Sequence, residues 1–158
     1  MLSLPGAMHM KIVQLEAKQI KGISIRTNNA NEFNPMTAKI AGLHQKFDEN
    51  ITVDYQNGAR VYAVYYNYES DHQGEYSVLA GADRIDSSQI ENLETVLIPN
   101  GTYMVFEAKG EVPQVVIETW MKIWEYFSKE NAQYQRAYTT DFEFYKSQHK
   151  IEIYIAVK

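Results

Sequence analysis

The sequence has no cysteine among its 158 residues. Disulfide bonds, thiolate nucleophiles and cysteine-based metal sites are therefore excluded. No apolar run approaches the length of about 18 residues that marks a membrane-spanning helix, so we predict that no part of the chain crosses a membrane. The first ten residues, MLSLPGAMHM, also lack the basic start and the long apolar stretch of a signal peptide. We interpret residues 1–10 as a leader or cloning remnant and predict a cytoplasmic protein.

Sequence motifs for metal, nucleotide and nucleophilic chemistry are missing as well. The histidines do not fall into HxH or HExxH spacing, and there is no GxSxG, GxGxxG or GxxxxGK[ST] motif. Asp71 and His72 are adjacent, but they lie in a predicted turn, where aspartate is expected to cap the backbone. The sequence therefore predicts no metal, no cofactor and no catalytic residue.

Positive charge is in the minority. The chain has 15 Lys and Arg residues against 20 Asp and Glu residues, which gives a formal net charge of −5. An acidic chain without a stripe of Lys or Arg is a poor nucleic-acid binder, because neutralising phosphates supplies most of that affinity. We therefore predict no direct binding to nucleic acid. The acidic balance is compatible with a cationic ligand, and it is equally the common state of cytosolic proteins.

The chain is rich in tyrosine, with 12 such residues and an aromatic content of 13%. Two predicted strands, 61–68 and 75–82, are joined by the turn-forming residues 69–74. Aromatic faces with polar rims suit the wall of a cavity for a flat, apolar or cationic ligand. The alternative is that these rings are ordinary core, as aromatic residues on strands commonly are. The tyrosines of this hairpin are Tyr62, Tyr65, Tyr66, Tyr68 and Tyr76.

The length fits one domain, over residues 11–158, and its order of elements repeats once. In the first half we predict a strand over 11–26, then a helix capped by Asn34 with Pro35 in its first turn, and then the tyrosine hairpin. The apolar face of this helix follows a 3.6-residue spacing and consists of Met36, Ile40, Leu43 and Phe47.

The second half has the same order. A helix begins near Pro113, and its apolar stripe is Val116, Trp120, Ile123, Trp124 and Phe127. The predicted strands are 93–98 and 102–108, on either side of a turn at 99–101, and then 141–145 and 151–157. Two β-α-β-β units most simply form one antiparallel-rich α+β sheet with both helices packed on it. A cleft where the two halves meet is a natural ligand pocket.

The last two strands contain the sharpest candidate site. Period-2 alternation puts apolar residues on one face of each strand and glutamate with tyrosine on the other. A carboxylate among tyrosines can complement a buried cation, because the hydroxyls hydrogen-bond it and keep it ionised. The alternative is a solvated sheet face, which is the usual meaning of alternating glutamate. If the two strands pair, one face carries Glu143, Tyr145, Glu152 and Tyr154.

These segments, in this order, resemble the GyrI-like effector-binding domains. That family includes the drug-binding halves of multidrug-responsive transcription activators, the DNA gyrase inhibitory protein and stand-alone integron cassette proteins. The resemblance covers residues 11–158, and the chain looks most like the integron cassette type, which consists of the binding domain alone. It rests on VYAVYYNYESDHQGEYSVLAG, IPNGTYMVFEAKG, the helix with Trp120 and Trp124, and the closing DFEFY and EIYIAVK.

The resemblance implies a pocket between two pseudo-symmetric halves, lined by aromatic residues and holding a buried glutamate that attracts cationic, amphipathic, drug-like compounds. By strand position, the resemblance implies Glu143 as this glutamate, with Glu152 as the second choice. The implied walls of the pocket are Tyr66, Tyr68, Trp120, Tyr145 and Tyr154.

Two other functions stay open. Some members of the family hydrolyse reactive ligands with acidic residues in the same cleft, which would make Glu143 and Glu152 an acid–base pair. The gyrase inhibitor suggests an interaction protein whose acidic surface inhibits a partner, and the sequence identifies no such partner. The leading expectation is a non-enzymatic small-molecule binding protein without a DNA-binding segment.

Overall fold

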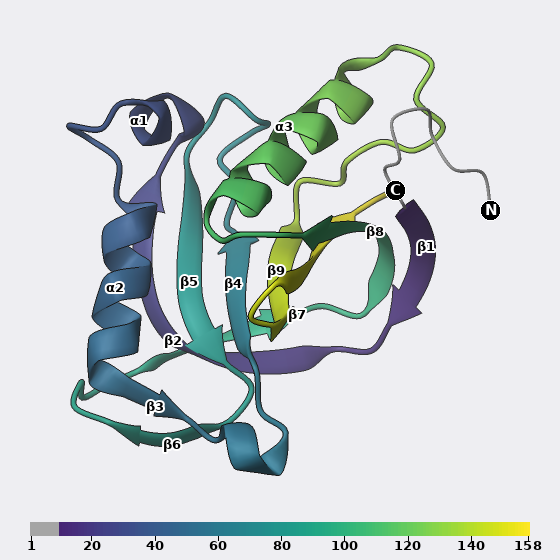
Figure 1. Ribbon diagram of the computed structural model, residues 1–158. Coiled ribbons are helices and arrows are strands. Elements are labelled where there is room, and N and C mark those ends of the chain that lie inside the picture. The colour runs from purple at the N-terminus through teal and green to yellow at the C-terminus, as the bar shows by residue number, and fades with distance from the viewer. Residues whose placement is uncertain (1–9) are drawn as a thin grey trace.

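One sheet of eight antiparallel strands forms the body of the molecule, with the helices on one of its faces (Figure 1). The computed structural model describes residues 10–158. The strand order is β1-β8-β10-β9-β4-β5-β2-β7. In chain order, these strands are β1 (Met10–Leu15), β2 (Lys18–Thr27), β4 (Val61–Tyr66), β5 (Tyr76–Ala82), β7 (Glu94–Ile98), β8 (Gly101–Lys109), β9 (Thr140–Ser147) and β10 (Lys150–Ala156). The other elements are α1 (Asn29–Phe33), α2 (Ile40–Asn50), α3 (Gln114–Ser128), a 3-10 turn at Tyr55–Asn57, and a small sheet of β3 (Ile51–Val53) and β6 (Ile85–Ser88).

Two β-α-β-β units form the large sheet together with β1 and β7, and the sequence predicts both units. The first unit consists of β2, α2, β4 and β5, and the second of β8, α3, β9 and β10. They meet where β4 pairs with β9, with Ala63 opposite Glu143. The predicted α+β class is confirmed, and the equivalent helices α2 and α3 pack into one core on the same face of the sheet.

A long two-stranded ribbon joins the two edges of this sheet. Leu15 of β1 pairs with Gly101 of β8, and three residues further on Lys18 of β2 pairs with Ile98 of β7. The antiparallel register therefore continues unshifted from β1 into β2 and from β7 into β8. Because β7 and β8 do not pair with each other, residues 99–101 form a bend within this ribbon and not the predicted turn.

The ribbon encloses a second core on the face away from the helices. Side chains alternate along a strand, so the same strands contribute to both cores. The core under the helices includes Leu43, Phe47, Val116, Trp120 and Ile123. The core under the ribbon includes Ile20, Ile98, Tyr62, Val64 and Phe142.

The first half departs from the prediction at the start of its helix. The chain forms the short helix α1, capped by the side chain of Asn28, and Asn34 is the residue that ends it. The side chain of Asn34 then accepts a hydrogen bond from the backbone of Met36, which is exposed. The predicted helix start at Asn34 is therefore wrong, and α2 begins only at Ile40.

A carboxylate from upstream caps α2. The backbone N–H groups of Lys39 and Ile40 donate to Glu32, at 2.9 and 3.1 Å, and the hydroxyl of Thr27 donates to the same carboxylate at 2.6 Å. Glu32 thus satisfies backbone donors that a helix start leaves open. A cap contributed from eight residues away leaves no trace in the local sequence pattern.

The predicted helix of the second half is confirmed. α3 follows Pro113, and Val116, Trp120 and Ile123 of the predicted stripe are buried. Among the helices of residues 10–158, none is long and apolar enough to cross a membrane. Residues 1–9 of the predicted leader lie outside the described residues, whereas Met10 already belongs to β1 and pairs with Phe106.

Candidate functional site

A cleft of about 1280 Å³ opens on the helix-bearing face of the sheet. Its floor comes from the central strands β4, β5 and β9, and its sides come from α1, α2 and α3. Its volume exceeds the roughly 300–1,000 Å³ that is usual for small-molecule pockets. The cleft lies where the two β-α-β-β units meet, which is the position that the sequence predicts.

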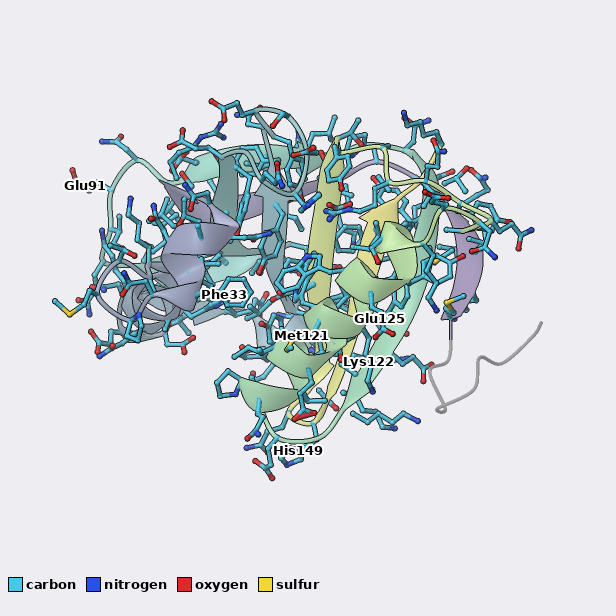
Figure 2. The ribbon with its side chains drawn as sticks, turned by 90° about the horizontal axis from the view of Figure 1, so that it is seen from above. Phe33, Glu91, Met121, Lys122, Glu125 and His149 are labelled. Carbon is cyan, nitrogen blue, oxygen red and sulfur yellow. The ribbon has the colours of Figure 1, made fainter. Side chains whose placement is uncertain are left out.

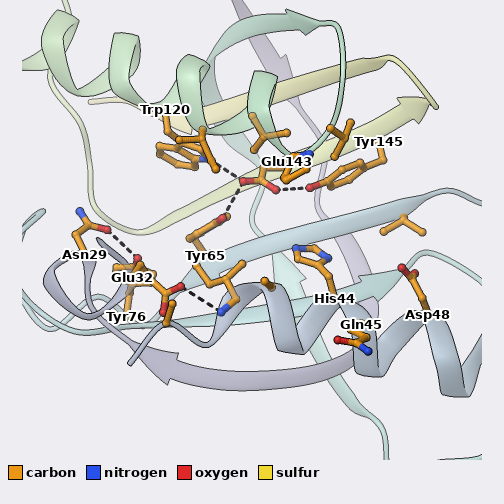
Figure 3. A pocket seen from close by; sticks show the side chains of 18 of the residues that line it. Asn29, Glu32, His44, Gln45, Asp48, Tyr65, Tyr76, Trp120, Glu143 and Tyr145 are labelled. Carbon is orange, nitrogen blue, oxygen red and sulfur yellow. Dashed lines mark hydrogen bonds between the residues drawn. The ribbon is translucent and has the colours of Figure 1, made fainter. Parts of the chain in front are cut away.

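Glu143 of β9 lies on the floor of the cleft, and only 1% of its surface is exposed. The indole Nε1 of Trp120 and the hydroxyl of Tyr65 donate to its Oε2 atom, at 2.7 and 2.8 Å (Figure 3). The hydroxyl of Tyr145 donates to Oε1 at 2.8 Å. These three donors come from α3, β4 and β9, so both halves of the fold contribute to the site.

No basic side chain of residues 10–158 forms an ion pair with this carboxylate. Burying a charge is costly unless it is paired or hydrogen-bonded, and hydrogen bonds to a carboxylate favour its ionised form. The carboxylate of Glu143 is therefore held by neutral hydrogen-bond donors.

The tyrosines around Glu143 keep their protons. Burial raises the pKa of Tyr65 well above its ordinary value, and the negative charge of Glu143 raises it further. The same two causes raise the pKa of Tyr145. Both hydroxyls are therefore neutral donors at physiological pH, and they hold the carboxylate without cancelling its charge.

Aromatic rings continue from Glu143 along the walls of the cleft. The ring of Tyr65 lies 5.1 Å from that of Trp120 and 5.8 Å from that of Tyr76. Tyr76 lies 5.8 Å from Tyr68, and Trp120 lies 6.2 Å from Trp124. Ring faces of this kind attract flat apolar groups and cations.

Apolar side chains surround the mouth of the cleft. In the view of Figure 2, Phe33 lies between α3 and the helices of the first half, and its ring centroid is 5.7 Å from that of Trp124. Phe33 is 68% exposed, and Val112 and Ile117 of the lining are 40% and 55% exposed. An apolar rim above a buried charge suits a ligand that is both lipophilic and charged.

Most of the side chains that we predicted as ligand-binding reach the cleft. Tyr68 does so although it lies two residues after Tyr66, which faces the other core. Between them, Asn67 has a left-handed φ of 53°, which breaks the alternation of the strand. The predicted residues that line the cleft are Glu143, Tyr68, Trp120 and Tyr145.

The other three predicted residues lie on the opposite face of the sheet. The register pairs Glu143 with Ile153 and Glu152 with Phe144. Directly opposed residues share a face, so Glu152 lies with Phe144, away from the cleft. The prediction that one face carries both glutamates is therefore wrong. Placed away from the cleft are Glu152, Tyr66 and Tyr154.

This geometry removes the acid–base pair that hydrolysis was expected to use. Glu143 and Glu152 lie on opposite faces of the sheet and cannot act on one ligand. Within residues 10–158, no group of three or more His, Cys, Asp or Glu side chains is placed to hold a metal ion. The arrangement around Glu143 can bind positive charge, and the other carboxylates that line the cleft are those of Glu32, Asp48 and Glu49.

Sequence patterns do not single out several residues of the cleft. Tyr65 and Tyr76 belong to the tyrosine hairpin, but only the pairing of β4 with β9 shows that Tyr65 lies beside Glu143. Arg136 lies between α3 and β9, in a stretch without a periodic pattern. Long-range pairing is the signal that would identify these residues, and it is not visible in a single sequence.

Solved structures of similar proteins extend over nearly the whole chain. The integron cassette protein VCH_CASS2 from the mobile metagenome of Vibrio cholerae has a TM-score of 0.85 and 39% identity, and the match covers 96% of this chain and 99% of that one. A putative transcription regulation protein from Staphylococcus aureus MU50 has a TM-score of 0.69 and 21% identity, over 96% and 99%. The protein SAV2435, solved with bound tetraphenylphosphonium, has a TM-score of 0.65 and 21% identity, over 95% and 94%. The last two show a shared fold.

A family model also matches nearly the whole chain. No curated protein matches the chain at a significant level. A family model described as integron-associated effector binding protein matches residues 11–157. The match spans both β-α-β-β units and the whole cleft between them. The chain therefore belongs to the family of integron-associated effector-binding proteins.

Proposed function

We propose that this protein binds lipophilic, amphipathic cations in the cleft, with Glu143 as the counter-charge. The observation that carries this proposal is a carboxylate, 1% exposed, that receives three hydrogen bonds from neutral donors and belongs to no ion pair among residues 10–158. A cationic ligand supplies the missing positive charge. Membership of an effector-binding family supports small-molecule binding as the general function.

Charge and aromatic contact together give the proposed selectivity. An ionised carboxylate away from water carries a desolvation cost, which a cation placed beside it offsets. The faces of Tyr65, Trp120 and Tyr76 add an attraction of about 0.5–2 kcal/mol each for a cation that lies over them. A neutral ligand of the same shape gains the apolar contacts but leaves the carboxylate unpaired.

The ligand bound to SAV2435 supports this class of compound. Tetraphenylphosphonium is a cation with four aromatic rings and no hydrogen-bond donor, so a protein can recognise only its charge and its rings. SAV2435 shares the fold at 21% identity. For the present chain, Glu143 and its aromatic neighbours are the specific support.

We infer binding without turnover, in the cytoplasm and without direct contact with duplex DNA. Glu143 has three hydrogen-bond donors beside it, and the other predicted acid, Glu152, lies on the opposite face of the sheet. The net charge of −5 disfavours phosphate contacts. These features support a protein that holds its ligand and leaves it unchanged.

A fluorescence titration tests this function. Trp120 and Trp124 line the cleft, so their emission reports on a bound ligand. We expect saturable binding of tetraphenylphosphonium in the micromolar range, which corresponds to about −8 kcal/mol. Tetramethylrhodamine methyl ester, an ester-bearing cation, should be recovered unchanged after prolonged incubation. A titration without saturation contradicts the proposed binding, and release of the free acid from the ester contradicts binding without turnover.

A further inference from the structure

Arg136 is a charged side chain of the cleft that has no part in holding Glu143. Arg136 follows α3 in the chain, lines the cleft and is only 7% exposed. It bridges to Val157, and the next residue, Ala137, donates its backbone N–H to the oxygen of Ala156 at 2.9 Å. This backbone pairing with the end of β10 holds the Cα atom of Arg136 in place.

The hydrogen bonds of the guanidinium group to residues 10–158 come from its Nη2 atom. Nη2 of Arg136 donates to Oδ2 of Asp141 at 2.6 Å, and both side chains are buried. The hydroxyl of Tyr68 donates to the same oxygen, while Oδ1 of Asp141 accepts from the backbone N–H of Ala156 at 2.8 Å. The ring of Tyr138 lies 4.4 Å from Cζ of Arg136. These contacts orient the guanidinium group and neutralise its charge.

The Nε atom of Arg136 has no hydrogen-bond partner. Of all the buried side-chain nitrogen and oxygen atoms in residues 10–158, it alone is left unsatisfied. Buried donors in folded proteins are nearly always satisfied, by protein, water or ligand. Asp141 already pairs with Arg136, so Nε lacks a hydrogen-bond acceptor, and this acceptor need not carry a charge.

Trp120 lies against both Arg136 and Glu143. Its Nε1 atom donates to Glu143, and its ring centroid lies 5.9 Å from Cζ of Arg136. The acid and the unsatisfied donor therefore border the same indole. A ligand with one flat ring system can contact both within a cleft of about 1280 Å³.

We propose that Arg136 forms an acceptor-binding subsite of the cleft, so that the preferred ligands are amphipathic cations that also carry a carbonyl or carboxylate oxygen. This inference rests on the proposed cation binding at Glu143 and adds an orientation to it. The positive end of the ligand lies at Glu143, and the oxygen accepts a hydrogen bond from Nε of Arg136. A cation without such an oxygen fills the cleft but leaves this donor unpaired.

Three dyes with the same xanthylium ring system test this subsite. Tetramethylrosamine has no acceptor on its pendant ring, whereas tetramethylrhodamine and its methyl ester have a carboxylate and a carbonyl there. We expect the wild-type protein to bind both oxygen-bearing dyes about tenfold more tightly than tetramethylrosamine. Arg136→Lys keeps a positive charge opposite Asp141 but lacks Nε. It should lose this preference and bind tetramethylrosamine within about twofold of wild type.

Arg60→Lys is the matched control. Arg60 lines the same cleft, but its Nε donates to the backbone oxygen of Lys146 at 3.3 Å and its Nη1 to that of Ala59 at 2.8 Å. This variant should retain the dye preference. Equal affinity of the wild-type protein for the three dyes overturns the subsite, even if Arg136→Lys fails to fold. A preference that survives in folded Arg136→Lys overturns it as well.

Tetramethylrosamine separates this inference from the proposed cation binding. It carries the charge without the acceptor, so its affinity depends on Glu143 and not on Arg136. Loss of its binding in Glu143→Gln supports the cation site whatever the dye preference is. Unchanged binding in that variant contradicts the cation site itself.

Discussion

Glu143 is surrounded by hydrogen-bond donors that carry no charge. Two tyrosine hydroxyls and one indole N–H occupy positions that water takes around an exposed carboxylate. An arginine or lysine in their place would form a neutral ion pair, and the cleft would lose its negative charge. The tyrosine and tryptophan donors around one glutamate therefore distinguish this arrangement from an ordinary buried ion pair.

These tyrosines predict a fall in stability at alkaline pH. The unfolded chain has tyrosine pKa values near about 10, and burial raises the pKa of Tyr65 and Tyr145 above that. The folded state therefore binds these protons more tightly, and the stabilisation is complete below pH of about 10 and is lost as the pH rises towards the folded pKa. Each such phenol contributes a slope of up to about 1.4 kcal/mol per pH unit.

Urea unfolding between pH of about 8 and 11.5 measures this slope. The double variant Tyr65→Phe and Tyr145→Phe should have a lower free energy of unfolding at neutral pH, because Glu143 loses two donors. Above pH of about 10, its stability should fall less steeply than that of the wild type. Parallel slopes would contradict the assignment of raised pKa values to these two hydroxyls.

Sequence alternation identifies which residues of one strand share a face, and this is sufficient to select Glu143 with Tyr145. It does not show how two strands are aligned. The register between β9 and β10 shifts between Lys150 and Ile151. This shift places Glu152 on the face of the sheet opposite to that of Glu143. The left-handed φ of Asn67 is equally invisible to alternation. A prediction of the sheet face on which a side chain lies therefore fails at bulges and at single residues with unusual backbone angles.

Among the elements, β2 and β5 approach each other unusually closely. Gly22 of β2 lies opposite Gly81 of β5. A Cβ atom on Gly22 would lie 2.0 Å from the backbone oxygen of Ala80, a distance that no real contact allows. This pairing positions β2 for its second partner, β7, and so supports the end of the ribbon.

Two glycine-to-alanine changes test this contact. Gly22→Ala should lower the free energy of unfolding by about 1–3 kcal/mol or more, because backbone and not side chain must move. Gly42→Ala is the control. Gly42 lies within α2 and has no atom within 4 Å of an added Cβ, so this change should stabilise the protein by about 0.5–1 kcal/mol. A Gly22→Ala variant as stable as wild type would show that the strands are not in close contact there.

Element types follow from the sequence better than element boundaries and partners do. The stripe of α3 is regular and predicts its helix, whereas α2 starts at a cap from Glu32, which only the folded chain brings near. The predicted strand 11–26 similarly corresponds to β1 and β2. These two strands pair with β8 and β7, whose residues lie about 80 positions further along the chain. Contacts of that range cannot be derived from local propensity.

Taken as a whole, the molecule builds one cleft from two similar units. The acid comes from the second unit, while Tyr65 and Tyr76 come from the first. Neither unit alone contains the carboxylate with its full set of donors. The central pairing of β4 with β9 therefore joins the two sides of the proposed binding site as well as the two halves of the sheet.

The overall charge leads to a prediction about DNA. With a net charge of −5, the chain lacks the excess of Lys and Arg that neutralises phosphates. We expect no shift of duplex DNA in an electrophoretic mobility assay at physiological salt. A sub-micromolar, sequence-selective shift produced by this chain would contradict that expectation.

Cation affinity of Glu143→Gln, measured by calorimetry with tetraphenylphosphonium, tests the cation site most directly. Glutamine keeps the size of the side chain and deletes the charge, so affinity should fall by about 2–5 kcal/mol. The melting temperature should stay the same or rise, because an unpaired buried charge is removed. Glu152→Gln is the control, since Glu152 is similarly buried, at 9% exposure, but lies outside the cleft.

We expect wild-type affinity for Glu152→Gln and a large loss for Glu143→Gln, with both variants folded. A folded Glu143→Gln protein that binds tetraphenylphosphonium as tightly as wild type would contradict the role of Glu143 as counter-charge, and the aromatic faces alone would then have to explain the binding.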